Sequence, residues 1–242
     1  MRTPRLLGLL LVPLLGLSGW FVYDSTRPAG AAPADTKVRY GLLKSGDQYG
    51  APVLYHFHFA EPVVIHDKSS AEIDALRERT EAPYVEKVLG LTTGDFRQEC
   101  TYIFRTRKKF LAKGYLLWVE DLKVELSADD LKVYVAREYP KGSCEYEETL
   151  KHELTHVAIH REVYEKYSRE LEDALSKARG IPGKTRPLLV GDPDEGSRRV
   201  KEAIEAVVNP VFDAYQEELA QRQSAFDSPE EYRGIQSRCT NW

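Results

Sequence analysis

The feature that most constrains the fold of this chain is a change of periodicity at residues 139–144, YPKGSC. Upstream, residues 100–138 are rich in β-branched and aromatic side chains. There Leu122, Val124 and Leu126 alternate with charged residues, which is the period of a half-buried strand. Downstream, apolar residues recur every three or four positions, which is the period of a helix. Strands followed by long helices predict an α+β fold rather than a doubly wound parallel sheet.

The strand-rich part predicts an antiparallel β-meander. YLLWVEDLKVEL and DLKVYVARE read as two strands that the turn-like residues 127–130, SADD, join as a hairpin. Earlier in the chain, VRYGLL and PVLYHFHF also read as strands. Ser69 with Glu72 three residues later is a capping box, so a helix is expected over residues 69–82, with a second helical candidate at residues 81–90.

Two long helices are expected after the periodicity changes. The first runs from about Glu147 to about Lys177, with a stripe of Val163, Tyr167, Leu171, Ala174 and Ala178. A Gly/Pro-rich loop follows at residues 180–196. The second helix has one apolar face formed by Val200, Ile204, Val207, Val211, Tyr215 and Leu219, and Pro210 is expected to kink or split it. Ser228-Pro229 marks one further helix start.

The N-terminus has the pattern of an exported protein. Two arginines precede the uncharged residues 6–22, LLGLLLVPLLGLSGWFV, as in a secretory signal, with a small-residue cleavage candidate at residues 29–31. The apolar run is near the lower limit for crossing a bilayer, so an uncleaved anchor and, less simply, a buried core helix remain alternatives. We therefore expect a signal peptide or anchor over residues 1–31, a linker over 32–37 and a single domain over 38–242.

Three cysteines, Cys100, Cys144 and Cys239, are present, and in an oxidising compartment one disulfide is expected. Their spacing does not fix the pairing. We favour Cys144 with Cys239, because that pair would tie the C-terminal tail to the start of the first long helix. Cys100 would then be a small apolar residue on a strand. Without CxxC spacing, the cysteines do not resemble a zinc–thiolate site.

The segment LKHELTHVAIH, residues 150–160, carries three of the six histidines of the chain. His152 and His156 are four residues apart, so both rings project from one face of the helix and can bind one ion. Glu153 is rotated by about 100° from His152, so it can reach a water on that ion from the side. Zinc would lower the pKa of that water, and Glu153 would take its proton as the water attacks a carbonyl. The alternative is an amphipathic helix with incidental histidines.

The residues around this motif strengthen the metal interpretation. Thr149, Leu150, Leu154, Thr155, Val157 and Ala158 are all uncharged. With these uncharged residues beside and between the two histidines, the segment resembles the zincin metallopeptidases. More loosely, residues 98–239, including FDSPEEY, resemble uncharacterised predicted secreted zinc-dependent proteases of bacteria. The resemblance implies a zincin-like fold, one zinc ion per chain and an antiparallel edge strand that binds extended substrate, for which DLKVYVARE is the expected candidate.

A catalytic zinc usually has a third protein ligand. His160 lies one more turn along the helix, but its Cα would be about 9 Å along the axis from an ion held by the first two histidines. A histidine side chain reaches only about 6 Å to a metal. Since no Gly or Pro breaks the helix after His156, His160 reads as a packed, hydrogen-bonded support for the site, with direct ligation as the alternative.

Other candidates for the third ligand lie elsewhere. In the gluzincin group of zincins the third ligand is a glutamate on a later helix, and Glu218 is the glutamate on the apolar stripe of the second long helix. His56 and His58 share one face of a strand and are a further possibility. For Glu218, His56 and His58 alike, the competing interpretation is a solvent-exposed or packed side chain that binds no metal.

The expected function is a secreted or periplasmic zinc-dependent peptidase, or one anchored by its N-terminal segment, acting on a peptide or protein substrate. A net charge of −4 argues against a nucleic-acid partner. Membrane contact is expected only through an uncleaved N-terminal segment, and no specific protein partner is indicated. The alternatives are a catalytically inactive zincin-like binding or envelope protein and a zinc amidase acting on cell-wall material. The intact Glu153 speaks against the first of these.

Overall fold

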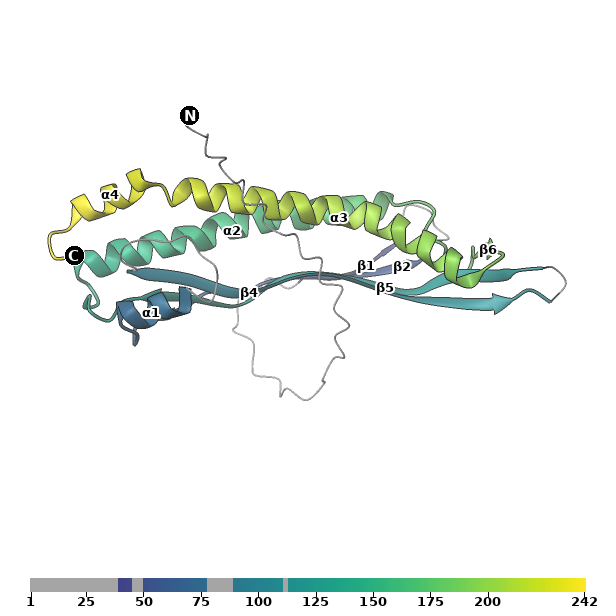
Figure 1. The fold of residues 1–242 in the computed structure, drawn as a ribbon, viewed down its shortest axis with the longest axis horizontal. Helices are drawn as coiled ribbons and strands as arrows, with labels where there is room; N and C mark the ends of the chain where they lie inside the picture. The colour runs from purple at the N-terminus through teal and green to yellow at the C-terminus, as the bar shows by residue number, and fades with distance from the viewer. Residues whose placement is uncertain (1–38, 45–49, 78–88, 111–112) are drawn as a thin grey trace, which may run out of the picture. The chain divides into compact units, whose positions relative to one another are not determined.

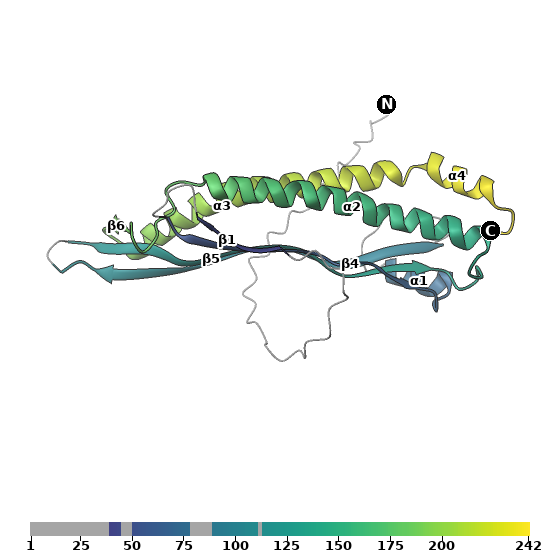
Figure 2. The ribbon, with the colours of Figure 1, turned by 180° about the vertical axis from the view of Figure 1, so that it is seen from behind.

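The computed structural model describes residues 39–44, 50–77, 89–110 and 113–242. Its elements are β1 (Arg39–Lys44), β2 (Pro52–Phe59), β3 (Val63–Ile65), α1 (Ser70–Arg77), β4 (Gly90–Lys108), β5 (Tyr115–Val135), α2 (Cys144–Lys177), β6 (Leu188–Val190), α3 (Pro193–Phe226) and α4 (Pro229–Arg238). The long helices α2 and α3 cover one face of the sheet (Figures 1 and 2). The chain therefore has a mixed fold of sheet and helices, as the change of periodicity predicted.

Several of the segments expected from the sequence lie wholly or partly outside the described residues. The expected signal or anchor at residues 1–31 and the linker at 32–37 lie outside the described residues, as do the end of the first predicted helix and most of the helical candidate at 81–90. Within the described ranges, no helix has both the length and the apolar character that a membrane span requires.

The central strand of the six-stranded sheet is β5. Along one of its edges, β4 pairs antiparallel over the full length of β5. The other edge is shared in turn by β6, which is antiparallel, and by β2 and β3, which are parallel to β5. The predicted antiparallel meander is therefore wrong, because the sheet is mixed and its parallel pairs need crossover connections.

The predicted hairpin at residues 127–130 is also wrong, because β5 runs straight through it. Asp130 has a φ of 50°, and the register of β4 against β5 shifts between Thr93 and Asp95. The turn-like residues thus make a β-bulge, which an aspartate tolerates. Ser127 Oγ donates a hydrogen bond to Asp129 Oδ2 at 2.9 Å, so these polar side chains are paired within the strand.

Both long helices begin at the residues that capping chemistry indicates. Ser143 caps α2 by accepting a hydrogen bond from the Tyr146 N–H at 3.2 Å, and Asp192 caps α3 just before Pro193. Ser228 caps α4 in the same way. Pro210 does not split α3, which is continuous to Phe226, and the proline ring lies on the exposed side of the helix.

The main hydrophobic cluster lies between the sheet and the long helices. Its fully buried members include Phe57, Leu122, Leu126, Leu171, Leu175 and Ile204. A second cluster joins α1 to the start of α2 through Ile73, Tyr139 and Tyr146. Cys144 and Cys239 form the expected disulfide, with Cα atoms 5.7 Å apart, and Cys100 is free and packs against the main cluster. All of this lies within one compact unit, Pro33–Trp242, which therefore contains its own core and disulfide.

Candidate metal centre

Three side chains converge where α3 ends beside α2. The Nε2 atoms of His152 and His156 lie 3.2 Å from each other. The Oδ1 atom of Asp227 lies 3.2 Å from the first nitrogen and 3.0 Å from the second. Among the described residues, this is the one group of at least three His, Cys, Asp or Glu side chains whose ligand atoms meet closely enough to hold an ion.

The spacing of these atoms fits a tetrahedral metal ion. Imidazole nitrogen and carboxylate oxygen bind zinc at about 2.0–2.2 Å, so two ligands of one tetrahedral ion are about 3.3 Å apart. The observed separations of 3.0 to 3.2 Å are close to that value. Two histidines and a carboxylate also form a ligand set that leaves a fourth position open, as in catalytic zinc sites. The residues present therefore fit such an ion.

The antiparallel packing of α3 on α2 delivers Asp227 to this place. Along the two helices, His160 pairs with Tyr215, His156 pairs with Gln223, and His152 pairs with Asp227 just beyond the end of α3. Asp227 lies at the junction between α3 and α4, where the chain leaves the helix and its side chain can turn towards α2.

The rings around Asp227 complete its surroundings. Phe226 stacks on His152 with centroids 4.7 Å apart, and the Tyr232 hydroxyl donates to Asp227 Oδ1 at 3.2 Å. Burial disfavours the charged carboxylate, but hydrogen bonds from His152 and His156 outweigh it and hold the pKa of Asp227 well below its usual range. The carboxylate is therefore in the ionised form that a metal ligand needs.

Gln223 fixes the orientation of His156. The side-chain oxygen of Gln223 accepts a hydrogen bond from Nδ1 of His156, and its Nε2 donates to the His156 backbone oxygen at 3.0 Å. When Nδ1 is the only protonated nitrogen of His156, as metal binding requires, Nε2 presents its lone pair to an ion in place of the hydrogen bond that it donates to Asp227. His152 Nδ1 is buried and has no hydrogen-bond partner among the described residues.

Glu153 is held against the sheet rather than among the ligands. It is only 6% exposed, and Thr92 on β4 donates a hydrogen bond to its Oε2 at 2.8 Å. Gly90 leaves room for it, since a Cβ at that position would lie 2.8 Å from Glu153 Oε1. Burial raises the pKa of Glu153, although the neighbouring His156 and His152 oppose that shift. A carboxylate with a raised pKa beside a ligand cluster is suited to accept a proton.

The structure places His160 away from the ligand cluster. Its Nε2 accepts a hydrogen bond from the Tyr215 hydroxyl, and its ring packs edge-on against Phe59 at 5.4 Å. Burial lowers the pKa of His160 to about 4. It is thus a buried neutral histidine that joins α2 to α3, and it does not belong to the cluster that Asp227 forms with His152 and His156.

The other candidates for the third position lie elsewhere too. Glu218 pairs with Lys166 Nζ at 2.5 Å and accepts a hydrogen bond from the Tyr167 hydroxyl at 2.9 Å. His58 pairs with Asp129 on β5, and His56 lies 3.8 Å from Glu125. Neither strand histidine belongs to the ligand cluster, because both alternate with the buried Phe57 and Phe59 and face away from the helices.

Sequence reasoning missed Asp227, Gln223, Thr92 and Gly90. The one local signal for Asp227 was the helix start at Ser228-Pro229, since residues that precede such a start leave helical geometry. The expected substrate strand, residues 130–138, is also wrong, because residues 132–134 of β5 lie between β3 and β4. In the described residues β4 pairs with β5 alone, so β4 is the edge strand beside Glu153.

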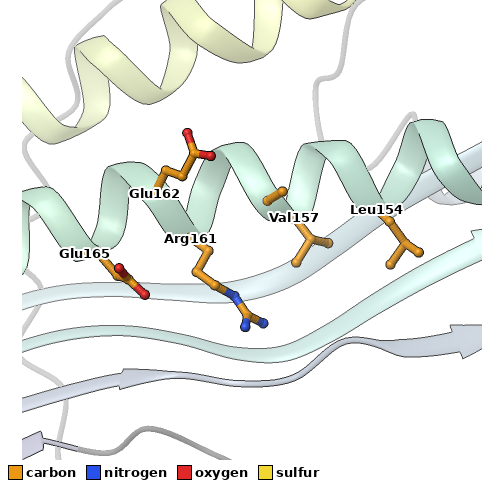
Figure 3. Close-up of a pocket in the computed structure, with 6 residues that line it drawn as sticks. Leu154, Val157, Arg161, Glu162 and Glu165 are labelled. Carbon is orange, nitrogen blue, oxygen red and sulfur yellow. The ribbon is translucent and has the colours of Figure 1, made fainter.

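A separate pocket of about 350 Å³ lies against α2 (Figure 3). It is lined by Leu154, Val157, Ala158, Arg161, Glu162 and Glu165. Leu154 and Arg161 lie on the far side of the helix from His152, at about 200° and 180° around its axis. This pocket contains neither ligand histidine and is therefore distinct from the metal centre.

Comparisons of the chain with protein-family models, with curated proteins and with solved structures found no match.

Proposed function

We propose that this chain is a zinc-dependent peptidase, secreted or periplasmic, with one zinc ion held by His152, His156 and Asp227. The observation that carries the proposal is the convergence of three ligand atoms within 3.2 Å beside a buried glutamate. The zincin-like character of the fold is part of this proposal. The export pattern of residues 1–31 supports the location.

Zinc bound here would supply Lewis-acid chemistry and a water with a pKa near neutrality. Glu153 is the general base that takes a proton from the attacking water and returns it to the leaving nitrogen. Its position is fixed by Thr92 on one side and by the backbone of Gly90 on the other. Such fixed placement is what general acid–base catalysis requires.

Tyr232 is the second group that we assign to the reaction. Its hydroxyl lies 3.2 Å from Asp227 Oδ1, and its ring lies 5.4 Å from that of His152. Burial raises the pKa of Tyr232, so the phenol keeps its proton and can donate it in a hydrogen bond. We assign it to the negative charge that develops on the carbonyl oxygen of the substrate.

Within the described residues one edge of β4 is unpaired, and this edge favours a peptide as substrate. An edge strand offers unpaired backbone N–H and C=O groups that can pair with an extended peptide. Because Thr92 on this strand contacts Glu153, a peptide added to β4 would run past the general base. Such strand pairing favours a peptidase over a cell-wall amidase, whose substrate presents no long strand.

The test is hydrolysis of unfolded casein by residues 33–242, compared between wild type and Glu153→Gln. We expect the variant to keep its zinc and to lose at least about 100-fold in rate, the usual contribution of a general base. Glu170→Gln, an exposed glutamate on α2, is the matched control and should retain full activity.

Three outcomes would contradict the proposal. If the zinc-loaded wild type cleaves isolated peptidoglycan and leaves casein intact, the chain is an amidase. If it binds zinc and cleaves neither substrate, it is a binding protein. If Glu153→Gln is as active as wild type, Glu153 is not the base.

A further inference from the structure

The end of the β4–β5 hairpin is basic and contains no acidic residue. Residues 104–115, FRTRKKFLAKGY, include five cations, although the whole chain has a net charge of −4. Four of them, Arg105, Arg107, Lys108 and Lys109, lie on or just after β4, and Lys113 precedes β5. Figures 1 and 2 show this end of the two strands reaching beyond α2 and α3.

Large apolar side chains are exposed among these cations. Phe110 is 99% exposed, and Ile103 on β4 is 49% exposed. Alternation along β4 places Ile103 on the same face as Arg105 and Arg107. Leu189 on β6, 53% exposed, pairs in register with Leu116 at the same end of the sheet. Exposed apolar groups that gather in one place mark an interaction surface more often than scattered ones do.

The five cations are exposed, and within the described residues none of them forms an ion pair. Among the described residues, no carboxylate therefore lies close enough to pair with their charge. Exposed cations without acidic partners repel one another, so an anionic partner relieves that repulsion.

The hairpin end does not belong to the metal centre. Thr92, which contacts Glu153, pairs with Val133 near one end of β5, whereas Lys108 pairs with Tyr115 at the other. These two positions of β5 are 18 residues apart, which corresponds to about 60 Å along an extended strand. A role for this surface is therefore separate from the proposed peptide hydrolysis.

We propose that the β4–β5 hairpin end docks on the surface of a bilayer rich in anionic phospholipid. The cations Arg105, Arg107, Lys108, Lys109 and Lys113 contact lipid phosphates, and Phe110 inserts among the acyl chains. Basic residues beside an exposed aromatic ring fit this interface, where charge and apolar burial act together. A nucleic acid would use the cations but would leave Ile103 and Leu189 in water. This contact is additional to any made by the N-terminal segment.

The test uses the compact unit Pro33–Trp242, which contains the whole described core and the disulfide but lacks the apolar residues 6–22. Co-sedimentation is measured with vesicles of phosphatidylcholine alone and of phosphatidylcholine with phosphatidylglycerol. We expect binding to the anionic vesicles only, weakened by added salt. Phe110→Ser should weaken it by about tenfold or more, through lost apolar burial.

A charge-matched pair of variants completes the design. The triple variant Lys108→Gln, Lys109→Gln, Lys113→Gln should lose about 100-fold in binding, at about fivefold for each cation. The control Lys141→Gln, Arg169→Gln, Arg179→Gln removes three exposed cations from elsewhere and should bind like wild type. Equal binding by the two triple variants would overturn the proposal. So would binding to a single-stranded oligonucleotide together with vesicle binding that Phe110→Ser leaves unchanged.

Discussion

At the residue scale, the position of the Glu153 carboxylate depends on a missing side chain. A Cβ at Gly90 would lie 2.8 Å from both Glu153 Cγ and Oε1, and 2.7 Å from Thr149 Cγ2. Gly90 has no positive φ to explain its identity, since it is not among the glycines of that kind. The close approach of β4 to α2 therefore explains why glycine suits this position.

Gly90→Ala tests this arrangement. The added methyl group should displace the Glu153 carboxylate, and a shift of about 1 Å costs on the order of 100-fold in rate. Zinc content should stay at the wild-type level, because the three atoms nearest to the added Cβ belong to Thr149 and Glu153 and not to a ligand of the centre. Gly191→Ala is the control, since a Cβ there meets nothing within 4 Å. Equal activity of both variants on casein would contradict the assigned position of Glu153.

The residues of the candidate site differ in how visible they are in the sequence. His152, Glu153 and His156 are set by helical spacing alone, so a local pattern could place them on one side of a helix. Asp227 lies 71 residues beyond His156 and reaches it only because α3 packs antiparallel on α2. No local period encodes such a contact. Helix pitch favoured His160 as a hydrogen-bonded support, and in the structure its Nε2 bonds to the Tyr215 hydroxyl and lies outside the cluster of His152, His156 and Asp227.

At the scale of elements, the long helices were predictable and the sheet was not. Each helix buries a stripe against one core, so a single period describes it. The residues at 127–130 have turn chemistry, yet β4 pairs with both flanks of this segment, β2 pairs with the preceding flank and β3 with the following one, so β5 stays extended through it. Tertiary pairing thus overrode local preference, and the irregularity was absorbed as a bulge at Asp130.

The disulfide should stabilise the element that follows Asp227. Cys144 and Cys239 enclose a separation of 95 residues and tie α4 to the start of α2. Replacing both with serine should lower the free energy of unfolding by about 2–5 kcal/mol, mostly by freeing the unfolded chain. Zinc affinity should fall as well, because α4 carries Tyr232 and begins next to Asp227.

Denaturant unfolding and chelator competition measure these two effects. Cys100→Ala is the control, since this cysteine is free, and it should change stability by about 1 kcal/mol. A double variant that matches the control in both stability and zinc affinity would show that the disulfide does not support the centre.

At the scale of the whole molecule, His160 should make stability depend on pH. Its pKa is about 4 when folded, against 6.5 in an unfolded chain. The unfolded state therefore binds more protons between these values. The contribution of neutral His160 to the free energy of unfolding is therefore complete above about pH 6.5, and it is lost as the pH falls towards 4. At about 1.4 kcal/mol per pKa unit, the loss is about 3 kcal/mol.

The free energy of unfolding of wild type and His160→Gln, measured from pH 7 to pH 4, isolates this contribution. The variant lacks the titrating group, so its stability should fall less steeply over that range. Parallel curves would contradict the buried neutral state of His160. Zinc content of the variant should remain near one per chain, because His160 is not a ligand.

Asp227 should complete a zinc site with His152 and His156. Metal content of purified residues 33–242 tests it most directly, by elemental analysis of wild type, Asp227→Ala and Glu218→Ala. Glu218 is the carboxylate on α3 that pairs with Lys166 instead of the histidines, so it is the matched control. We predict about one zinc per chain in wild type and in Glu218→Ala, and little or none in Asp227→Ala. Wild-type zinc content in Asp227→Ala, or none in wild type, would contradict the account.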